Sequence, residues 1–175
     1  MTFSNPAGAA ATAAPAYMRA LLDLLGSRPP LDVLGELLPW LEHRLGGVPD
    51  AVLRRPEAPG KWSVVAVVRH LADTELVYGF RGRMVLAEDR PPLHGFDQDG
   101  WAATFGYADA PLDASLAQLA AMRTANLALW RSLGPTQLAR VGRHSERGPE
   151  SMDLMLRMMA AHDLVHRRQI DRVLG

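Results

Sequence analysis

The sequence predicts an all-α protein, a four-helix bundle with extra short helices, and three observations lead to this prediction. Four segments of bundle length lie between clear breakers, and alanine and leucine are abundant in them. No segment shows the alternation of a convincing strand. The breakers are proline and glycine pairs or clusters, at Pro29-Pro30, Gly46-Gly47, Pro56 to Gly60, Pro91-Pro92, Gly134-Pro135 and Gly148-Pro149.

The helix termini carry recognisable signals. Ser63 is placed to cap the N-terminus of the second main helix, and Asp113 falls in the first turn of the third. Gly134 lies just past the end of the third helix, and Pro149 suits the first turn of the last. We therefore expect helices over about residues 17–25, 31–45, 63–87 and 112–133, and from about 149 almost to 175.

A long connection, from about Glu88 to Pro111, joins the second and third main helices. At more than 20 residues it is too long for a turn between neighbours. Asp97 and Asp99 are expected to cap its short DGWAA turn. Its aromatic side chains predict packing across the bundle, as a long crossover or as a lid over a pocket: Phe96, Trp101, Phe105 and Tyr107.

Length and composition bound the possible functions. A chain of 175 residues is expected to form one domain, here 17–175, behind a flexible lead-in at 1–16 that lacks the features of a signal peptide. Basic and acidic residues number 19 each, so no net charge draws the protein to nucleic acid or to acidic membranes. No apolar run approaches the length of a membrane span, and a cytoplasmic location is expected. Cysteine is absent, so any metal would be held by His, Asp or Glu, which favours Zn, Ni, Mn or Fe.

The last helix carries one inward-facing seam, in which spacings of three and four residues alternate. His162 and His166 occupy seam positions one turn apart on the same face. An H-x-x-x-H spacing alone is a weak signal, but burying two imidazoles requires hydrogen bonds or a metal ion. The seam consists of Met152, Met155, Met159, His162, His166, Gln169 and Val173.

On the second main helix, His70 lies close to the apolar face and is expected to be a third histidine directed at the bundle core. Three imidazoles from two helices match a zinc-type catalytic site that keeps one position for water, and Ni, Mn or Fe(II) fit equally. The alternative is structural: His70 bonded to a carbonyl, with His162 and His166 as a polar plug. The H-D-L-V-H segment lacks the glutamate of H-E-x-x-H, so peptidase activity by that route is not expected.

Two segments, KWSVVAVVRHLADTE and AAHDLVHRRQI, resemble the DinB-like family of metal-dependent bundle proteins. Family members show a W-S turn that opens the second main helix, then H-L-x-x-x-E, and H-x-x-x-H-x-x-Q-I near the C-terminus. APGKW and RVGRHSERGPES also look like family segments, and the resemblance spans about residues 31–174. The matching residues are Trp62, Ser63, His70, Leu71, Glu75, His162, His166, Gln169 and Ile170.

The resemblance implies that His70, His162 and His166 ligate a divalent metal ion in a bundle with a ligand cleft at one end. The metal stays open among Ni, Zn, Mn and Fe. Characterised relatives include transferases and isomerases that use mycothiol, bacillithiol or glutathione. The resemblance therefore favours an enzyme acting on a small-molecule substrate, either a transferase with an external low-molecular-weight thiol or a hydrolase. The family's name reflects DNA damage, but the neutral charge gives no support for DNA binding.

Several polar residues near the histidines are secondary candidates. Glu75 could orient a ligand or transfer a proton as a catalytic group, or form an ion pair with Arg69 or Arg81. Asp163 lies about 100° round the helix from His162, which favours a structural partner of nearby arginines. Gln169 could bond across the core or line the cleft. The arginines of the last turns complement the helix dipole or would dock an anionic cosubstrate: Arg167, Arg168 and Arg172.

A rival from another class is a non-catalytic metal-binding or stress-response bundle protein. An open coordination position beside a cleft favours an enzyme. A closed site with a fourth protein ligand, such as His94 or His144, favours the rival. A homodimer formed through a bundle face is a further expectation, because residues 21–38 are rich in leucine.

Overall fold

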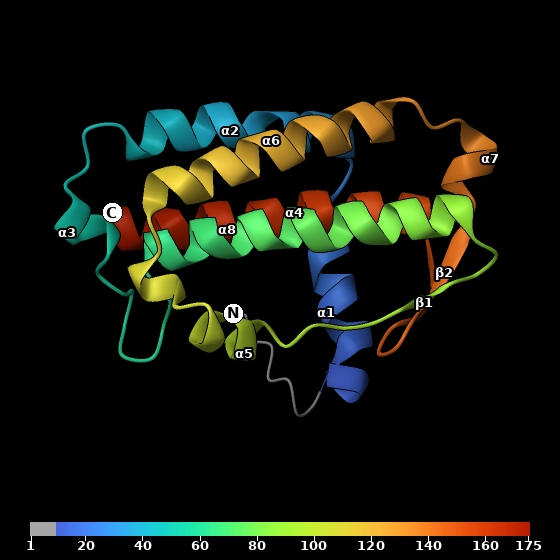
Figure 1. The fold of residues 1–175 in the computed structure, drawn as a ribbon, viewed down its shortest axis with the longest axis horizontal. Coiled ribbons are helices and arrows are strands. Elements are labelled where there is room, and N and C mark those ends of the chain that lie inside the picture. The colour runs from blue at the N-terminus through green and yellow to red at the C-terminus, as the bar shows by residue number, and fades with distance from the viewer. Residues whose placement is uncertain (1–9) are drawn as a thin grey trace.

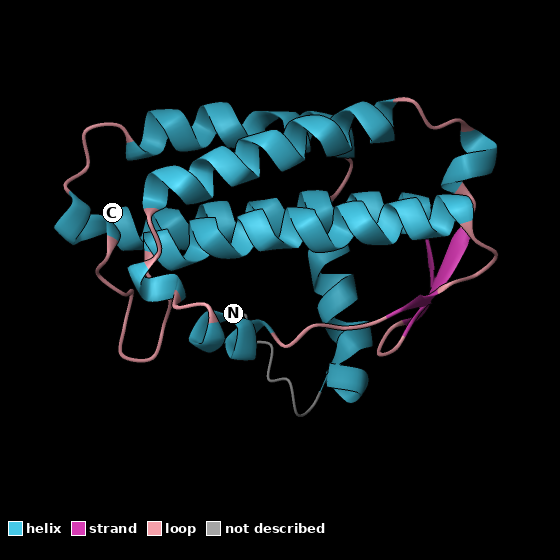
Figure 2. Ribbon diagram, in the orientation of Figure 1, coloured by secondary structure: helices cyan, strands magenta, loops and turns pink. Residues whose placement is uncertain are grey.

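The computed structural model describes residues 10–175. Most of this part of the chain is helical, as expected, and a small sheet lies at one end of the bundle (Figures 1 and 2). The elements are, in order, α1 Ala10–Leu25, α2 Pro30–Leu45, α3 Asp50–Leu53, α4 Val64–Ala87, β1 Pro92–Leu93, α5 Gln98–Thr104, the 3₁₀ turn η2 Tyr107–Asp109, α6 Leu112–Arg131, α7 Pro135–Leu138, β2 Val141–His144, β3 Gly148–Ser151 and α8 Met152–Leu174.

Four long helices, α2, α4, α6 and α8, form the predicted bundle (Figure 1). Helix α4 packs against α6 and α8, and α2 closes the bundle by packing against the same two helices. In Figure 1, α4 and α6 run in one direction, whereas α2 and α8 run in the other. Helix α1 lies outside the four and packs on α8. No helix among the described residues is long and apolar enough to cross a lipid bilayer.

The parallel course of α4 and α6 explains the long connection between them. After α4 ends, the chain must return along the bundle before α6 begins, and Figure 1 shows it passing through β1, α5 and η2 on the way. The connection is therefore the crossover that its length predicted. Tyr107 holds its far end, because the phenol donates a 2.7 Å hydrogen bond to Asp73 of α4. Asp97 accepts from Gly100 at the start of α5, as expected of a cap.

The prediction that the protein has no strand was wrong. Strand β2 pairs with β3 as an antiparallel hairpin and with β1 in parallel, in the order β1-β2-β3. The strands have two to four residues and contain glycine and proline, so they carry no alternating pattern. Pro149 belongs to β3, and α8 begins after Ser151, whose hydroxyl accepts from the N–H of Leu154 at 3.1 Å.

The N-terminal helix also differs from its predicted extent. Helix α1 begins at Ala10, seven positions before the expected start at Tyr17. Residues 1–9 of the expected lead-in lie outside the described residues. Ser63 caps α4 as expected, since its side chain accepts from the N–H of Ala66 at 3.3 Å.

The core consists of two apolar clusters with polar groups between them. One cluster holds the Met-rich start of α8 and the end of α4, and the other holds the start of α4 and the end of α8. We call the groups between them the polar layer, and all of its side chains are buried. The polar layer comprises His70, Asp73, Thr74, Glu75, Arg123, Asn126, Asp163 and His166.

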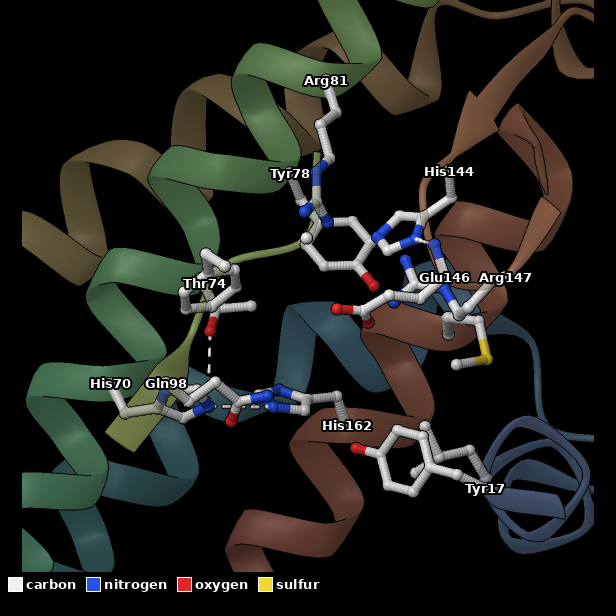
Figure 3. Close-up of a pocket in the computed structure, with 14 residues that line it drawn as sticks. Tyr17, His70, Thr74, Tyr78, Arg81, Gln98, His144, Glu146, Arg147 and His162 are labelled. Carbon is white, nitrogen blue, oxygen red and sulfur yellow. Dashed lines mark hydrogen bonds between the residues drawn. The ribbon is translucent and has the colours of Figure 1, made fainter. Parts of the chain in front are cut away.

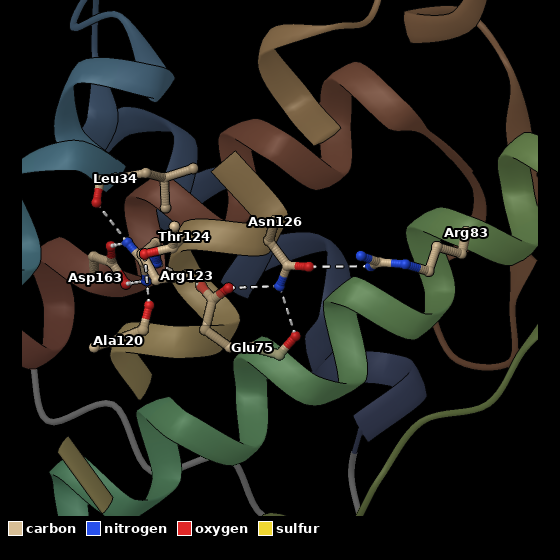
Figure 4. A network of polar contacts seen from close by, with 8 residues as sticks. All are labelled: Leu34, Glu75, Arg83, Ala120, Arg123, Thr124, Asn126 and Asp163. Atoms are coloured by element: carbon tan, nitrogen blue, oxygen red, sulfur yellow. Dashed lines mark hydrogen bonds and ion pairs between the residues drawn. The ribbon is translucent and has the colours of Figure 1, made fainter. Parts of the chain in front are cut away.

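Arg123 of α6 binds the other three bundle helices from within the polar layer (Figure 4). Its guanidinium donates to the Leu34 carbonyl of α2 at 2.8 Å, and contacts Glu75 of α4 at 2.7 Å. It also makes two bonds to Asp163 of α8, at 2.6 and 3.0 Å. Arg123 is only 2% exposed, so all of its charge is compensated inside the protein.

Replacing Arg123 by leucine should destabilise the fold strongly. The Arg123→Leu change leaves the buried carboxylates of Glu75 and Asp163 without their cation, and loss of one partner from a buried ion pair costs about 3–5 kcal/mol. Urea unfolding followed by circular dichroism measures the change in unfolding free energy. Arg44→Leu is the matched control, because Arg44 pairs with Asp171 on the surface and such pairs contribute about 0–1 kcal/mol. Equal losses in the two variants would contradict the assigned role of Arg123.

Candidate metal centre

Three histidines from α4 and α8 meet inside the bundle, as the sequence predicted. Their ligand nitrogens all lie within 4.8 Å of one another. The Nε2 atom of His162 lies 3.0 Å from Nε2 of His70 and 3.0 Å from Nε2 of His166. His70 and His166 are buried, whereas His162 is half-buried. The i, i+4 spacing on α8 presents two rings to the single ring that α4 contributes.

Hydrogen bonding does not readily account for this arrangement. A ring nitrogen offers one in-plane lone pair or one N–H, so Nε2 of His162 cannot donate to one neighbour and accept from the other. Three lone pairs directed at a shared cation account for both short distances. Two nitrogens bound tetrahedrally at about 2.0–2.1 Å from one ion lie about 3.3 Å apart, close to the observed 3.0 Å. The donor set therefore fits one divalent ion.

Gln169 sets the orientation of one ligand. Its Oε1 atom lies 2.9 Å from Nδ1 of His166, so Nδ1 carries the proton and donates, which leaves the Nε2 lone pair for the cluster. Of the two roles expected for Gln169, the structure favours the second, because Gln169 lines a cleft and its bond goes to its own helix and not across the core.

Loss of hydration keeps the three imidazoles neutral. Burial lowers the pKa of His70 and of His162 well below the ordinary value, and the neighbouring histidines lower it further. Burial also lowers the pKa of His166 to about 4, although the bond to Gln169 opposes the shift. At neutral pH the cluster presents unprotonated nitrogens, the form that binds metal ions.

Aromatic side chains enclose His70. The ring of Trp62, in the turn before α4, lies 4.9 Å from the His70 ring, and Phe96 of the long connection stacks at 6.4 Å. Phe96 in turn contacts Trp101 at 4.9 Å. The Nδ1 atom of His70 is buried and has no hydrogen-bond partner in the described part of the chain. The connection therefore contributes Phe96 to a wall of the site, whereas Phe105, also expected to pack across the bundle, is 55% exposed.

Two cavities reach the histidines. A cleft of about 780 Å³ is lined by His162 and His166 together with Trp62 and three cationic side chains, those of Lys61, Arg168 and Arg172. A smaller cavity of about 50 Å³ is lined by His70, Thr74 and His162. Figure 3 shows this smaller cavity, with His70 and His162 at one side and His144 and Arg81 at the other. Space for a substrate thus lies beside the ligand set.

Glu75, the candidate catalytic group, is directed toward α6. Its carboxylate contacts Arg123 at 2.7 Å and Asn126 at 2.6 Å. Five helical positions separate Glu75 from His70, which turns their side chains about 140° apart. The contacts favour the ion-pair alternative, although its partner is Arg123 and neither Arg69 nor Arg81.

The two aspartates next to the histidines have structural partners. Asp163 is bound by Arg123, which confirms the expected structural pairing with an arginine. Asp73 pairs with Arg69 at 3.1 Å and accepts the Tyr107 hydroxyl. Neither aspartate belongs to the group of metal-ligating side chains among the described residues.

The other histidines stand apart from the cluster. His43 and His94 are exposed. His144 is 3% exposed and lines the smaller cavity. None of the three is a fourth member of the ligand group in the described residues, so the contacts provide no closed four-histidine site.

Sequence reasoning missed the residues that complete the smaller cavity, namely Tyr78, Arg81, Glu146 and Arg147. A signal for part of this set was present. His70, Thr74, Tyr78 and Arg81 follow at spacings of four, four and three, which places them along one face of α4. The hairpin residues could not be placed beside that face without knowing that β2 and β3 exist.

The chain is similar in fold and in sequence to bacterial proteins described as metal-dependent hydrolases. YfiT from Bacillus subtilis, described as "a probable metal-dependent hydrolase with an unusual four-helix bundle topology", superposes with a TM-score of 0.77 at 26% identity, covering 82% of this chain and 83% of that one. A protein of Oceanobacillus iheyensis is 30% identical over 107 residues, and one of Geobacillus kaustophilus is 28% identical over 131 residues. Both carry the name "Putative metal-dependent hydrolase".

The shares of the chains that align differ between these relatives. The match covers 61% of this chain and 62% of the Oceanobacillus protein, so it spans less than two thirds of that relative's length. It covers 74% of this chain and 74% of the Geobacillus kaustophilus protein. The model of the DinB superfamily matches residues 40–170, which include all three histidines. Bundle, histidine cluster and sequence match agree, and the chain belongs to the DinB superfamily.

Proposed function

We propose that the protein is a metal-dependent enzyme of the hydrolase type whose divalent ion is held by His70, His162 and His166. The observation that carries the proposal is the meeting of three neutral imidazole nitrogens, within 4.8 Å of one another, beside a large cleft. The names of the relatives point to the same chemistry. Imidazole ligands suit Zn, Ni, Mn and Fe.

The chain's own residues would hold and shield the ion. Gln169 keeps the Nε2 lone pair of His166 available, and Arg123 fixes α8 by binding Asp163, the neighbour of His162. Trp62 and Phe96 pack their rings against His70 on the α4 side of the site. Three protein ligands leave a position free, and the cleft gives a substrate access to His162 and His166.

A bound divalent ion would supply Lewis acidity, lowering the pKa of a water or thiol nucleophile so that it reacts near neutral pH. The size of the cleft determines which nucleophiles fit beside the ion. At about 780 Å³, a size typical of pockets for drug-sized molecules, it has room for a water molecule and also for a larger thiol.

Thiol transfer is a second candidate that one observation favours. The cleft carries Lys61, Arg168 and Arg172 beside the acids Asp23, Glu57 and Asp99. Arg172 pairs with Glu57, so Lys61 and Arg168 are the cations that would meet an anionic cosubstrate. The chain has no cysteine, so the thiol would be an external, low-molecular-weight one. Incubating the zinc-loaded protein with an activated ester and with an electrophilic aryl halide plus thiol separates the two reactions. Neither product forming would favour the non-catalytic rival.

Metal content tests the ligand assignment directly. We expect about one divalent ion per chain in untagged protein after incubation with Zn, Ni or Mn, and near-complete loss in His162→Ala because two imidazoles bind far more weakly than three. Inductively coupled plasma mass spectrometry measures the content. His94→Ala is the matched control, because His94 is exposed and outside the cluster. Wild-type protein that stays empty with every ion would contradict the proposal.

Gln169→Leu should weaken metal binding without abolishing it. The substitution preserves the size of the side chain but removes the acceptor for Nδ1 of His166, and loss of such a supporting bond typically costs about 10–100-fold in metal affinity. Competition with a chromophoric chelator measures the dissociation constant. An unchanged constant would show that Gln169 does not orient His166.

The metal-free protein should lose stability in acid. The pKa of each ligand histidine is lowered in the folded state. Below about pH 6.5, therefore, these three histidines take up protons in the unfolded chain but not in the folded protein. The unfolding free energy therefore falls as pH drops from 6.5 toward 4, by about 1.4 kcal/mol per pH unit for each histidine. Urea unfolding at pH 7, 6 and 5 measures the slope.

Variants isolate the histidine contribution from that of other groups. Burial raises the pKa of Glu75 and Asp163, and such groups stabilise the fold as pH falls, with the opposite sign. His166→Asn should therefore reduce the acid-induced loss by about 1.4 kcal/mol per pH unit, while His43→Asn, on the surface, should leave it unchanged. If the unfolding free energy of the wild type and of His166→Asn fell equally with pH, the loss would not come from the buried histidines.

A further inference from the structure

The smaller cavity beside His70 and His162 is rich in hydrogen-bond donors that the proposed metal site does not use. Helix α4 contributes Tyr78 and Arg81, and the β2–β3 hairpin contributes His144 and Arg147 (Figure 3). These side chains come from two elements that meet only in the folded protein.

Arg81 is a buried cation without a carboxylate partner. It is 4% exposed, and its guanidinium donates to the backbone carbonyl of His94 and lies 5.5 Å from the Tyr78 ring. Arg123, the other buried arginine among the described residues, pairs with acids, and so does the half-buried Arg147. No carboxylate of the described residues forms an ion pair with Arg81. A buried charge in that state is costly unless a further group compensates it.

His144 presents an unused donor to the same space. Its Nδ1 atom accepts a 3.2 Å hydrogen bond from the backbone N–H of Glu146. Burial, together with Arg147 and Arg81, lowers the pKa of His144 to about 3, so the ring is neutral and its proton sits on Nε2. That Nε2 atom is buried and has no partner in the described residues. Figure 3 shows the ring turned toward Tyr78 and Arg81.

The remaining charges of the cavity leave Arg81 available. Arg147 makes two bonds to buried Glu150, at 3.1 and 3.0 Å, so that pair is neutral. Glu146 also lines the cavity and is half-buried, but it lies beyond ion-pair distance of Arg81. The Glu146 carboxylate would repel an anion that enters the cavity.

We propose that this cavity is a subsite for a substrate carboxylate, bound by the Arg81 guanidinium and the Nε2–H of His144. A carboxylate is planar and offers two oxygens that match the fork of a guanidinium. The volume of about 50 Å³ holds about four water-sized atoms at 10–15 Å³ each, enough for the three heavy atoms of a carboxylate. A tetrahedral phosphate is larger and carries more charge than one free arginine compensates.

The subsite rests on the proposed function, because it would anchor the compound on which the metal centre acts. Side chains on a helix lean toward its N-terminus, so Arg81 reaches back along α4 toward Tyr78 and the histidines. The cavity is continuous from Arg81 and His144 to His70 and His162. The proposed substrate class is therefore a small carboxylic acid.

A titration with ¹³C-labelled acetate, followed by carbon NMR at constant ionic strength, tests the subsite in metal-free and in zinc-loaded protein. We expect saturable binding in both forms. Arg81→Gln should weaken it at least tenfold, and His144→Phe, which keeps a flat ring without the donor, about three- to tenfold. Glu146→Gln should tighten it, because a facing negative charge is removed. Arg143→Gln is the matched control, since Arg143 is exposed on β2 and does not line the cavity.

Each outcome decides the proposal. Acetate that binds only the zinc-loaded protein, and equally well in Arg81→Gln, would be a metal ligand and would overturn the subsite. Phosphate binding as tightly as acetate would overturn the carboxylate assignment. Binding to metal-free protein that depends on Arg81 would support the subsite even if the proposed metal chemistry failed. If Arg81→Gln does not fold, His144→Phe and Glu146→Gln, with their opposite expected effects, still decide the question.

Discussion

The geometry of the site depends on one buried arginine. Arg123 of α6 binds Leu34 of α2, Glu75 of α4 and Asp163 of α8, so a single guanidinium sets how the four bundle helices are rotated and spaced at the level of the polar layer. Asp163 follows His162 directly, and the ion pair turns α8 so that both of its histidines face α4. A purely apolar contact would tolerate a shift of α8 along its axis, whereas the bidentate bond to Asp163 does not.

Within the polar layer, Arg123 is the ion-pair partner of two buried carboxylates, those of Glu75 and Asp163. Burial raises the pKa of both Glu75 and Asp163, although Arg123 opposes the shift. The Asn126 amide donates to the carboxylate and to the backbone carbonyl of Glu75. Asn126 can approach α4 this closely because residue 79 is glycine, and a Cβ atom there would lie 2.5 Å from the Asn126 amide oxygen. The polar layer therefore joins the helices through one guanidinium and two carboxylates, and Asn126 adds hydrogen bonds to Glu75.

Much of this could be predicted from the sequence, and the rest has identifiable physical reasons. The long helices and His70, His162 and His166 follow from periodicity, because helical spacing is a local property. The strands escaped prediction because β1 to β3 are short, hold Pro92, Gly148 and Pro149, and exist through pairing between distant segments. The ion pair of Glu75 was among the expected alternatives, but its partner could not be predicted, because the contact with Arg123 depends on how α4 packs against α6. The donors around Arg81 required the hairpin to be known.

The separation of His70 and His162 along the chain has a thermodynamic consequence. The two rings meet across 92 residues, whereas His162 and His166 are already neighbours in any helical fragment of α8. An ion shared by all three would close a long loop, as a covalent crosslink does, and for a loop of about 100 residues the chain-entropy effect of such a closure is about 4.7 kcal/mol. In the unfolded chain only His162 and His166 would still bind the ion together. The ion would therefore bind the native state more tightly, by the binding free energy that His70 contributes. The free energy that the third ligand adds to ion binding is therefore also the free energy by which the ion stabilises the packing of α4 against α8.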